Sequence, residues 1–572
     1  MSRISLKLIV LSVALVPATS AGAQMKEAVG AYLAARQASM DKDYTAAAKY
    51  FSRALAEDPD NPAIMESTVI SHVSLGDIGR ALPIARKIDE AGLKSQIAFM
   101  VLMADAVKRG DYGAVIDRIE AGRGVGSLAD GMVTAWIHLG QGDMKAALSG
   151  FDTVADQPGL RGFAIYHKAL ALASAGDFEA AERVFDGKSD GAMQRTRRGT
   201  IAWAQVLSQL GRHDEAVALI DDAFGANLDP EIQDLRNRLG AGEQVPFSLV
   251  SGAVDGVAEV FYSLGQALKP DTSADYVLLY ARISRYLNPA HVDATMMAAE
   301  LLESLGRHEM AIDAYKAVPP GHPTHVMAEI GRTEALRQAG KPDAAIEALD
   351  QLARDNPDLP VIQVSLGDLY RDMERFEDAA AAYDRAIELY DGRDTDQWFV
   401  YYVRGISHER IGAWKKAEAD FRRALDLNPD QPQVLNYLGY SLVEKRMKLD
   451  EALDMIERAV AARPDSGFIV DSLGWAYYRL GRYEDAVGPM EHAAELMPTD
   501  PVVNDHLGDV LWTVGRRQEA RFQWTRALSL IDRDNPSPDI DPARIRRKLE
   551  VGLDEVLTEE GALPVEVVDD GG

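Results

Sequence analysis

The chain has 572 residues, of which 47% are hydrophobic, a share that is ordinary for globular proteins. Its 61 Lys and Arg residues against 89 Asp and Glu residues give a formal net charge of -28, which argues against nucleic acid and anionic lipid as partners, because both require a cationic footprint. The absence of cysteine excludes disulfide bonds, thiolate zinc sites, cysteine nucleophiles and lipid attachment through an N-terminal cysteine.

The first 23 residues have the pattern of a secretory signal peptide. Arg3 and Lys7 precede an apolar run from Leu8 to Val16, and small residues follow up to Ala23, after which cleavage is expected. The run is much shorter than the roughly 20 residues that span a bilayer, and no later segment is apolar enough to do so. We therefore expect an exported chain in a bacterial periplasm, without an integral membrane segment after cleavage; secretion beyond the periplasm stays open.

A short turn recurs along the chain with a period near 34 residues. Each period contains two amphipathic helical patterns on either side of the turn, where Gly is favoured because it tolerates left-handed backbone angles. One such helix pair cannot bury its apolar face alone, whereas stacked pairs form a solenoid. The turns fall at Lys42, Gly76, Gly110, Gly142, Gly176 and Gly211, and again at Gly306, Gly340, Glu374, Gly412, Met447, Gly481 and Gly515.

The residues within one period carry a recognisable pattern. In "VDSLGWAYYRLGRYEDAVGPMEHAAELMP" it consists of Val470, Leu473, Gly474, Tyr477, Gly481, Ala486, Met490, Ala493 and Pro498. This pattern resembles the tetratricopeptide repeat, strongly over residues 292–531 and more loosely over residues 27–224. The resemblance implies an all-α solenoid of tandem helix-turn-helix repeats that binds protein partners.

The repeat register breaks once, in the middle of the chain, where residues 240–256 are rich in Gly, Ser and Pro. We therefore expect two arrays joined by an irregular segment. The expected parts are a signal peptide at residues 1–23, a degenerate N-terminal array at 24–239, a linker at 240–256, a C-terminal array at 257–533 that opens with a degenerate repeat, a capping helical region at 534–557 and a disordered acidic tail at 558–572.

Catalytic and metal-binding patterns are not apparent. His308 and His408 each precede a Glu but lack the second His of a metalloprotease helix, and His322 and His325 lie in a Pro-rich turn without a third ligand. No phosphate-binding Gly-rich loop and no Gly-x-Ser-x-Gly elbow is present. We therefore expect a protein that is not an enzyme and that needs no cofactor and no metal.

A candidate binding surface follows from helical geometry. Asp471, Trp475 and Tyr478 lie on a stripe about a quarter-turn from the packing stripe, at positions that the resemblance places in the inner groove of the solenoid. With the equivalent positions of neighbouring repeats, the candidate partner-binding residues are Tyr402, Asn436, Tyr440, Asp471, Trp475, Tyr478, Asp505, Asp509 and Trp512.

Two interpretations of these residues remain open. They form an aromatic ladder for an extended apolar or basic peptide, with the polar residues supplying hydrogen bonds, or they fill space between successive first helices. An acidic peptide is disfavoured in either case, because the first groove position is Tyr402, Asn436, Asp471 and Asp505 in successive repeats and would repel a carboxylate.

The last four repeats resemble a narrower group. Residues 434–487 and 504–524 are similar to the C-terminal block of bacterial envelope tetratricopeptide proteins. That group includes an adaptor lipoprotein for a periplasmic carboxyl-terminal processing protease, whose lipid-attachment cysteine this chain lacks. The resemblance implies an exported, non-catalytic scaffold or adaptor whose partner is a protein or peptide, such as a periplasmic protease or its substrates. The alternative is a scaffold for envelope polysaccharide or cell-wall assembly, in which stacked aromatics hold sugar rings.

Overall fold

The computed structural model describes residues 20–187, 196–225, 228–390, 397–532 and 540–561, and its regular secondary structure there is entirely helical. The described residues divide into two compact units, one ending at Asp355 and the other beginning at Asn356. Of the expected signal peptide, residues 1–19 lie outside the described part, as do residues 562–572 of the expected tail. No helix among the described residues is long and apolar enough to cross a bilayer.

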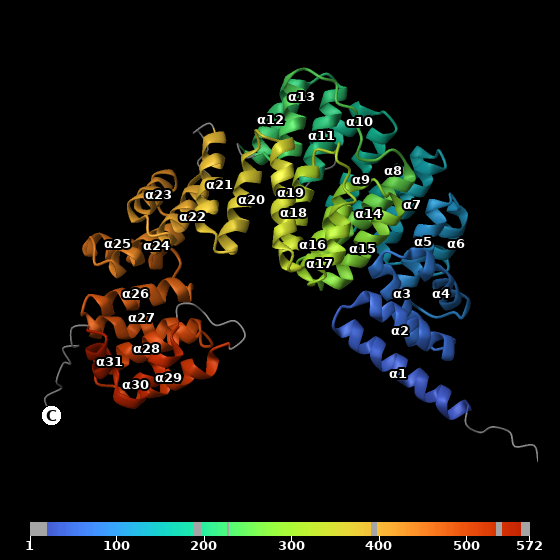
Figure 1. Ribbon diagram of the computed structural model, residues 1–572. Helices are drawn as coiled ribbons and strands as arrows, with labels where there is room; N and C mark the ends of the chain where they lie inside the picture. The colour runs from blue at the N-terminus through green and yellow to red at the C-terminus, as the bar shows by residue number, and fades with distance from the viewer. Residues whose placement is uncertain (1–19, 188–195, 226–227, 391–396, 533–539, 562–572) are drawn as a thin grey trace, which may run out of the picture. The chain divides into compact units, whose positions relative to one another are not determined.

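Unit 1 contains helices α1 to α19 (Figure 1). Their bounds are α1 Ser20–Met40, α2 Tyr44–Glu57, α3 Pro62–Leu75, α4 Ile78–Glu90, α5 Gln96–Lys108, α6 Tyr112–Glu120, α7 Ser127–Gly140, α8 Met144–Ala155, α9 Arg161–Ser174, α10 Phe178–Phe185, α11 Arg197–Gln209, α12 His213–Phe224, α13 Pro230–Gly240, α14 Ala253–Leu268, α15 Ala274–Leu287, α16 Val292–Ser304, α17 His308–Tyr315, α18 His325–Gln338 and α19 Pro342–Asp355.

Unit 2 contains helices α20 to α31. Their bounds are α20 Pro360–Asp372, α21 Phe376–Leu389, α22 Trp398–Arg410, α23 Trp414–Leu427, α24 Pro432–Glu444, α25 Leu449–Ala462, α26 Gly467–Arg479, α27 Tyr483–Leu496, α28 Pro501–Thr513, α29 Arg517–Leu530, α30 Pro542–Val551 and α31 Leu553–Glu559.

The turn inside each repeat has the expected left-handed backbone. Gly76 has a φ of 83°, and the two non-glycine turn residues Lys42 and Glu374 both adopt a φ of 58°. The expected turn residue Met447 is the exception, because Arg446 and Lys448 on either side of it take positive φ values of 52° and 46°. The period-34 pattern thus placed the turns correctly, with an error of one residue at this longer connection between α24 and α25.

In unit 2, a Gly within each first helix from α20 to α28 permits close helix packing. A Cβ atom added to Gly405 on α22 would lie 2.7 Å from the ring of Phe421 on α23, and one added to Gly439 on α24 would lie 2.8 Å from the carbonyl oxygen of Ala452 on α25. No side chain fits at these positions without displacing the second helix. The expected all-α solenoid of paired helices is confirmed.

The helical hairpin α14–α15, which the sequence places at the start of the second array, stacks on α16 and also packs back on the first array. α14 contacts α5, α7 and α9, and α15 contacts α3 and α5, so the hairpin lies along first helices of earlier repeats (Figure 1). The reason lies in the composition of α14, which buries Gly256, Val257 and Phe261 among many other residues. This helix has more apolar surface than contact with one neighbouring repeat can cover.

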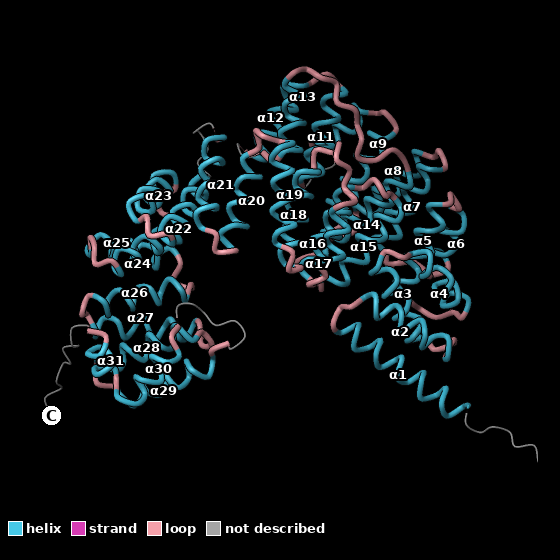
Figure 2. The backbone as a smooth tube through the Cα atoms, in the orientation of Figure 1, coloured by secondary structure: helices cyan, strands magenta, loops and turns pink. Residues whose placement is uncertain are grey.

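This packing moves the division between the units. Residues 241–252, the centre of the expected linker, form the loop that leads from α13 into α14 within unit 1 (Figure 2). Unit 1 ends with α19, and unit 2 begins before α20. The irregular segment therefore lies inside unit 1, and the expected division into arrays at residues 24–239 and 257–533 stays a prediction.

Candidate functional site

The inner face of unit 2 is formed by its first helices, α20, α22, α24, α26 and α28. Contacts link α20 with α22, α24 with α26, and α26 with α28, whereas successive second helices do not approach one another as closely. A helical array curves toward the side on which its helices are closer together. All nine predicted site residues lie on the last four of these first helices.

Trp475 on α26 is the centre of an aromatic stack. Its ring lies 3.9 Å from that of His506 on α28 and 4.7 Å from that of Tyr478, measured between centroids, with interplanar angles of 17° and 22°. The indole Nε1 donates a hydrogen bond of 3.0 Å to Glu444 at the end of α24. The indole therefore bridges three successive first helices.

His506 is enclosed by carboxylates. Its Nδ1 lies 3.1 Å from an oxygen of Asp471, which is 7% exposed. Burial alone would lower the pKa of His506, but the charge of Asp471, followed by those of Asp505 and Asp509, outweighs burial and raises it above 6.5.

Asp505 and Asp509, one turn apart on α28, bind the chain's own C-terminal helix. Lys548 of α30 is completely buried and its Nζ lies 2.9 Å from Asp505 and 2.6 Å from Asp509. Asp509 also accepts a hydrogen bond of 2.9 Å from the indole of Trp524. Burial, followed by the charge of Asp509, raises the pKa of Asp505.

Trp512, the last predicted site residue, is covered by the same cap. It is 6% exposed, and its Nε1 donates a hydrogen bond of 3.0 Å to Asp554 of α31. Gly552, between α30 and α31, lies so close to the indole that any side chain there would overlap it. α30 and α31 therefore stack on α28 as a further repeat would, and they end the array.

The remaining three predicted residues lie in the middle of unit 2. Tyr402 is half-buried, with its ring 6.1 Å from that of Phe421 and 6.0 Å from that of Tyr437. Asn436 is 1% exposed, and its amide oxygen has no hydrogen-bond partner among the described residues. Tyr440 is half-buried on α24.

The nine predicted residues do not form one continuous site. Asp471, Trp475 and Tyr478 form one cluster with His506, and Asp505, Asp509 and Trp512 form a second with the cap, while Tyr402 packs at the repeat core. The contacts between successive first helices follow the space-filling interpretation. The role of the nine residues in binding a partner stays a prediction.

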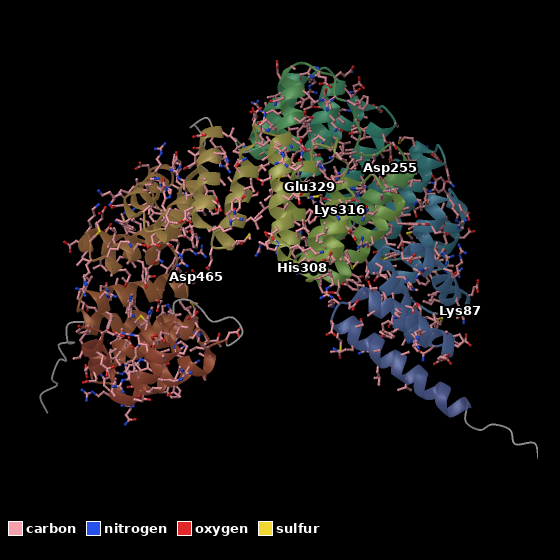
Figure 3. The ribbon with its side chains drawn as sticks, viewed as in Figure 1. Lys87, Asp255, His308, Lys316, Glu329 and Asp465 are labelled. Atoms are coloured by element: carbon pink, nitrogen blue, oxygen red, sulfur yellow. The ribbon has the colours of Figure 1, made fainter. Side chains whose placement is uncertain are left out.

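Two exposed phenylalanines on this face were missed by the sequence reasoning. Phe399 on α22 is 41% exposed and Phe468 on α26 is 62% exposed. Phe468 follows the turn that contains Asp465 (Figure 3) and precedes Trp475 by seven residues, which places both side chains on one stripe of α26. Extending the predicted stripe by one turn toward the N-terminus, from Tyr402 on α22 and from Asp471 on α26, would have found both phenylalanines.

The corresponding face of unit 1 is occupied. Tyr166 on α9 donates a hydrogen bond of 2.8 Å to Glu259 of α14, and Lys108 on α5 donates to the carbonyl oxygen of Tyr286 on α15. The first turn of α14 contains Asp255, labelled in Figure 3. The hairpin α14–α15 thus covers this face of the array.

His322 and His325, which the sequence analysis disfavours as metal ligands, lie in the turn between α17 and α18 and at the first residue of α18, respectively. The Nδ1 of His322 accepts a hydrogen bond of 3.2 Å from the backbone of Thr324, and the Nδ1 of His325 lies 3.3 Å from the carbonyl oxygen of Val318. Within the described ranges, no group of three His, Asp or Glu side chains is placed to hold a metal ion.

Comparison with known proteins identifies the repeat. A tetratricopeptide repeat model matches residues 32–92, 334–394, 364–432, 402–467 and 445–501, and a second one matches residues 198–222. A TPR repeat-containing protein of Pseudomonas aeruginosa is 35% identical over 85 residues, which are 15% of this chain and 14% of that protein. The matched segment therefore spans about a seventh of the relative.

Solved structures of similar arrangement have low identity. The Cut9–Hcn1 hetero-tetramer of APC/C is 14% identical over 94% of this chain and 99% of that one, with a TM-score of 0.37. Yeast Tom70 is 14% identical over 94% of this chain and 99% of its own, with a TM-score of 0.36. MamA is 24% identical over 29% of this chain and 94% of its own, with a TM-score of 0.26.

The repeat matches and the helix pairs define the class of this protein. It is an all-α solenoid of tetratricopeptide repeats, a fold that generally serves as a non-catalytic scaffold for protein–protein interaction.

Proposed function

We propose that this protein is an exported, non-catalytic adaptor that holds a protein or peptide partner on the inner face of unit 2. One contrast carries the proposal: the inner face of unit 1 is covered by α14–α15, whereas Phe399 and Phe468 on the inner face of unit 2 are 41% and 62% exposed. Large aromatic side chains left in water on a curved surface are typical of binding anchors.

The charged side chains on this face are paired with one another, which leaves the exposed apolar side chains as the anchors for a partner. Glu444 pairs with Arg479 at 3.1 Å, and Glu409 pairs with Lys445 at 3.3 Å, so these ionic groups compensate one another within the protein. Partly exposed pairs of this kind contribute little affinity, and burial of apolar surface on the phenylalanines contributes more. A partner segment would therefore place apolar side chains on Phe399 and Phe468.

The expected signal peptide and the resemblance of the last four repeats point to an envelope partner, namely a periplasmic protease or its substrates. An adaptor of this kind acts by raising the local concentration of a substrate near the protease. Export is tested by fractionating cells that produce the tagged full chain. A periplasmic form that begins at Gln24 supports export, and a cytoplasmic form with intact residues 1–23 contradicts it.

Partner binding is tested by affinity capture from an envelope extract with the full chain, followed by mass spectrometry. The double variant Phe399→Ser and Phe468→Ser should lose the captured partner, because it removes both anchors; within the protein it also removes the edge contact between Phe399 and Trp398, so folding of the variant is checked by circular dichroism. Phe522→Ser is the matched control, since Phe522 is 63% exposed but lies on the second helix α29, away from the inner face. Capture that is equal in the wild type and the double variant, or lost equally in the control, would show that the inner face is not the binding site.

A further inference from the structure

Unit 1 encloses a cavity of about 680 Å³ beside the inserted helix α14. Its walls come from α9, α11 and α14, at the end of the inner face that the hairpin leaves uncovered. The volume falls within the range of about 300–1,000 Å³ that is usual for small-molecule sites. Nothing in the partner-binding role of unit 2 requires this cavity, so its use is a separate question.

One guanidinium in the wall is fully compensated. Arg198 binds Glu259 through two hydrogen bonds, of 3.0 and 2.7 Å, and also pairs with Asp293. Glu259 is completely buried and accepts further hydrogen bonds from Tyr166, at 2.8 Å, and from His291, at 3.0 Å. Its carboxylate is therefore saturated by protein donors and offers no site for a cation.

The second guanidinium is compensated in the same way. Arg197 pairs with Asp229 and lies 2.7 Å from Glu231. Each arginine in the wall thus faces two carboxylates, and neither has uncompensated positive charge for an anionic ligand. The excess of carboxylates over guanidinium groups disfavours an anionic ligand, and the buried Glu259 oxygens that a cation would need already accept hydrogen bonds from the protein.

The groups with unused hydrogen-bonding capacity are neutral. The Tyr262 hydroxyl accepts a hydrogen bond of 2.8 Å from the Gln266 amide, which leaves its own proton for a ligand. Thr196 uses its hydroxyl oxygen as acceptor for the backbone N–H of Gly199 at 3.1 Å, and the Ser263 hydroxyl also lines the cavity. Hydroxyl and amide groups that can both donate and accept match the hydroxyl groups of a sugar.

Aromatic side chains supply the apolar part of the wall. Phe163, Tyr166 and Tyr262 line the cavity together with Ala267. Tyr166 and Tyr262 are 8% and 9% exposed, so their rings are held in place by packing before any ligand enters. The guanidinium of Arg198 lies over the Tyr262 ring, 5.4 Å from its centroid, so the half-buried Phe163 is the aromatic side chain of the wall that is left to pack on a ligand. An aromatic ring beside several hydroxyl groups suits a sugar ring, which has an apolar C–H face and a polar rim.

We propose that this cavity is a binding site for a neutral saccharide. The Phe163 ring would pack on the sugar face, while Tyr262, Ser263 and Gln266 would form hydrogen bonds with its hydroxyl groups. The cavity is formed jointly by the first array and the inserted helix, so a bound sugar would also hold α14 on α9 and α11.

The test is calorimetric titration of the full chain with sugars that differ in charge. The neutral probes are glucose, N-acetylglucosamine and the chitin disaccharide, and the charged probes are glucuronate and glucosamine. We expect saturable binding of at least one neutral probe, at least about tenfold tighter than either charged probe, because no charged group of the wall is left to pair. A cell-wall glycan fragment in a further titration distinguishes a polymer end from a free sugar.

Three variants locate the site. Ser263→Ala and Gln266→Ala alter the partly exposed rim, and Tyr262→Phe removes only a hydroxyl, so all three should fold and should weaken binding about tenfold each. Tyr280→Phe on α15, which removes a hydroxyl away from the cavity, is the control and should bind as the wild type does. Absence of binding by every neutral probe, preference for a charged probe, or unchanged affinity in the three variants would overturn the proposal.

Discussion

The indole of Trp136 on α7 lies directly against the backbone of Gly256 on α14. A methyl group placed on Gly256 would overlap the six-membered ring of this indole, which is completely buried. Because α7 and α14 belong to repeats far apart in the sequence, this contact fixes the inserted hairpin in the groove of the first array. The contact depends on a residue without a side chain.

Gly256→Ala should therefore destabilise unit 1. We expect the free energy of unfolding to fall by about 1–3 kcal/mol, the usual cost of overpacking a close contact. Urea denaturation followed by tryptophan fluorescence measures it. Gly113→Ala on α6 is the control, because an added methyl there has no atom within 4 Å, and we expect it to be neutral or stabilising. Equal losses in both variants would contradict the docking role of Gly256.

The buried ion cluster should matter more than an exposed ion pair that holds the same hairpin. Glu259→Ala leaves Arg198 buried with one partner fewer and should cost about 3–5 kcal/mol of unfolding free energy. Asp275→Ala breaks the Lys42–Asp275 pair, in which both side chains are about one-third exposed, and should cost about 1 kcal/mol or less. Both are read by chemical denaturation, and a smaller effect for Glu259→Ala would refute this ranking.

The stability of unit 2 should depend on pH through His506. Because neighbouring carboxylates raise the folded-state pKa of His506 above 6.5, its protonation stabilises the folded form. This contribution is fully present below about pH 6.5 and is lost as the pH rises through the folded-state pKa. Urea midpoints measured between pH 6 and pH 9 should fall in the wild type and change less in His506→Gln. Identical pH profiles in the two proteins would exclude His506 as the source.

A single turn offers a stabilising substitution. Glu374 adopts a φ of 58°, which costs a non-glycine residue roughly 1 kcal/mol. Glu374→Gly should recover part of this strain and raise the melting temperature of unit 2. Gly412→Ala, at an equivalent turn with a φ of 75°, is the reverse experiment and should lower it by a similar amount. Two shifts of the same sign would show that backbone strain does not control these turns.

The repeat architecture was predictable because it is local. The spacing of Gly76 and Gly110 reports a turn, and the stripe of Leu473 and Tyr477 reports which side of a helix is packed. Both signals lie within one repeat, and the turns and helix pairs were found where the period placed them.

The inserted hairpin could not be predicted in the same way. Arg282 on α15 donates a hydrogen bond of 3.1 Å to the carbonyl oxygen of Ser74, 208 residues earlier in the chain. Burial lowers the pKa of Arg282 to about 10, which reflects how deeply the hairpin enters the array. No spacing rule within a repeat specifies which distant groove an apolar helix pair will fill.

The candidate site was predicted in part for a related reason. The helical stripe located Trp475 and Trp512 on the correct helices, but their exposure depends on the next first helix, and for Trp512 on the cap. Sequence periodicity reports the direction of a side chain and not what lies in front of it. Phe399 and Phe468, which face water, were missed because the predicted stripe begins at Tyr402 on α22 and at Asp471 on α26, one turn after each phenylalanine.

The link between Arg282 and Ser74 gives unit 1 different folding behaviour from a simple repeat array. In such an array each repeat is stabilised by its nearest neighbours, so the ends can fray while the middle persists. In unit 1, α3 is held by a helix that is synthesised more than 200 residues later. Early repeats must therefore await α15 before they reach full stability, and unit 1 should fold slowly and melt as one cooperative block. Under a pulling force, unit 1 should therefore unfold in a single step, as a globular domain does, whereas an open solenoid would lengthen gradually as its repeats separate.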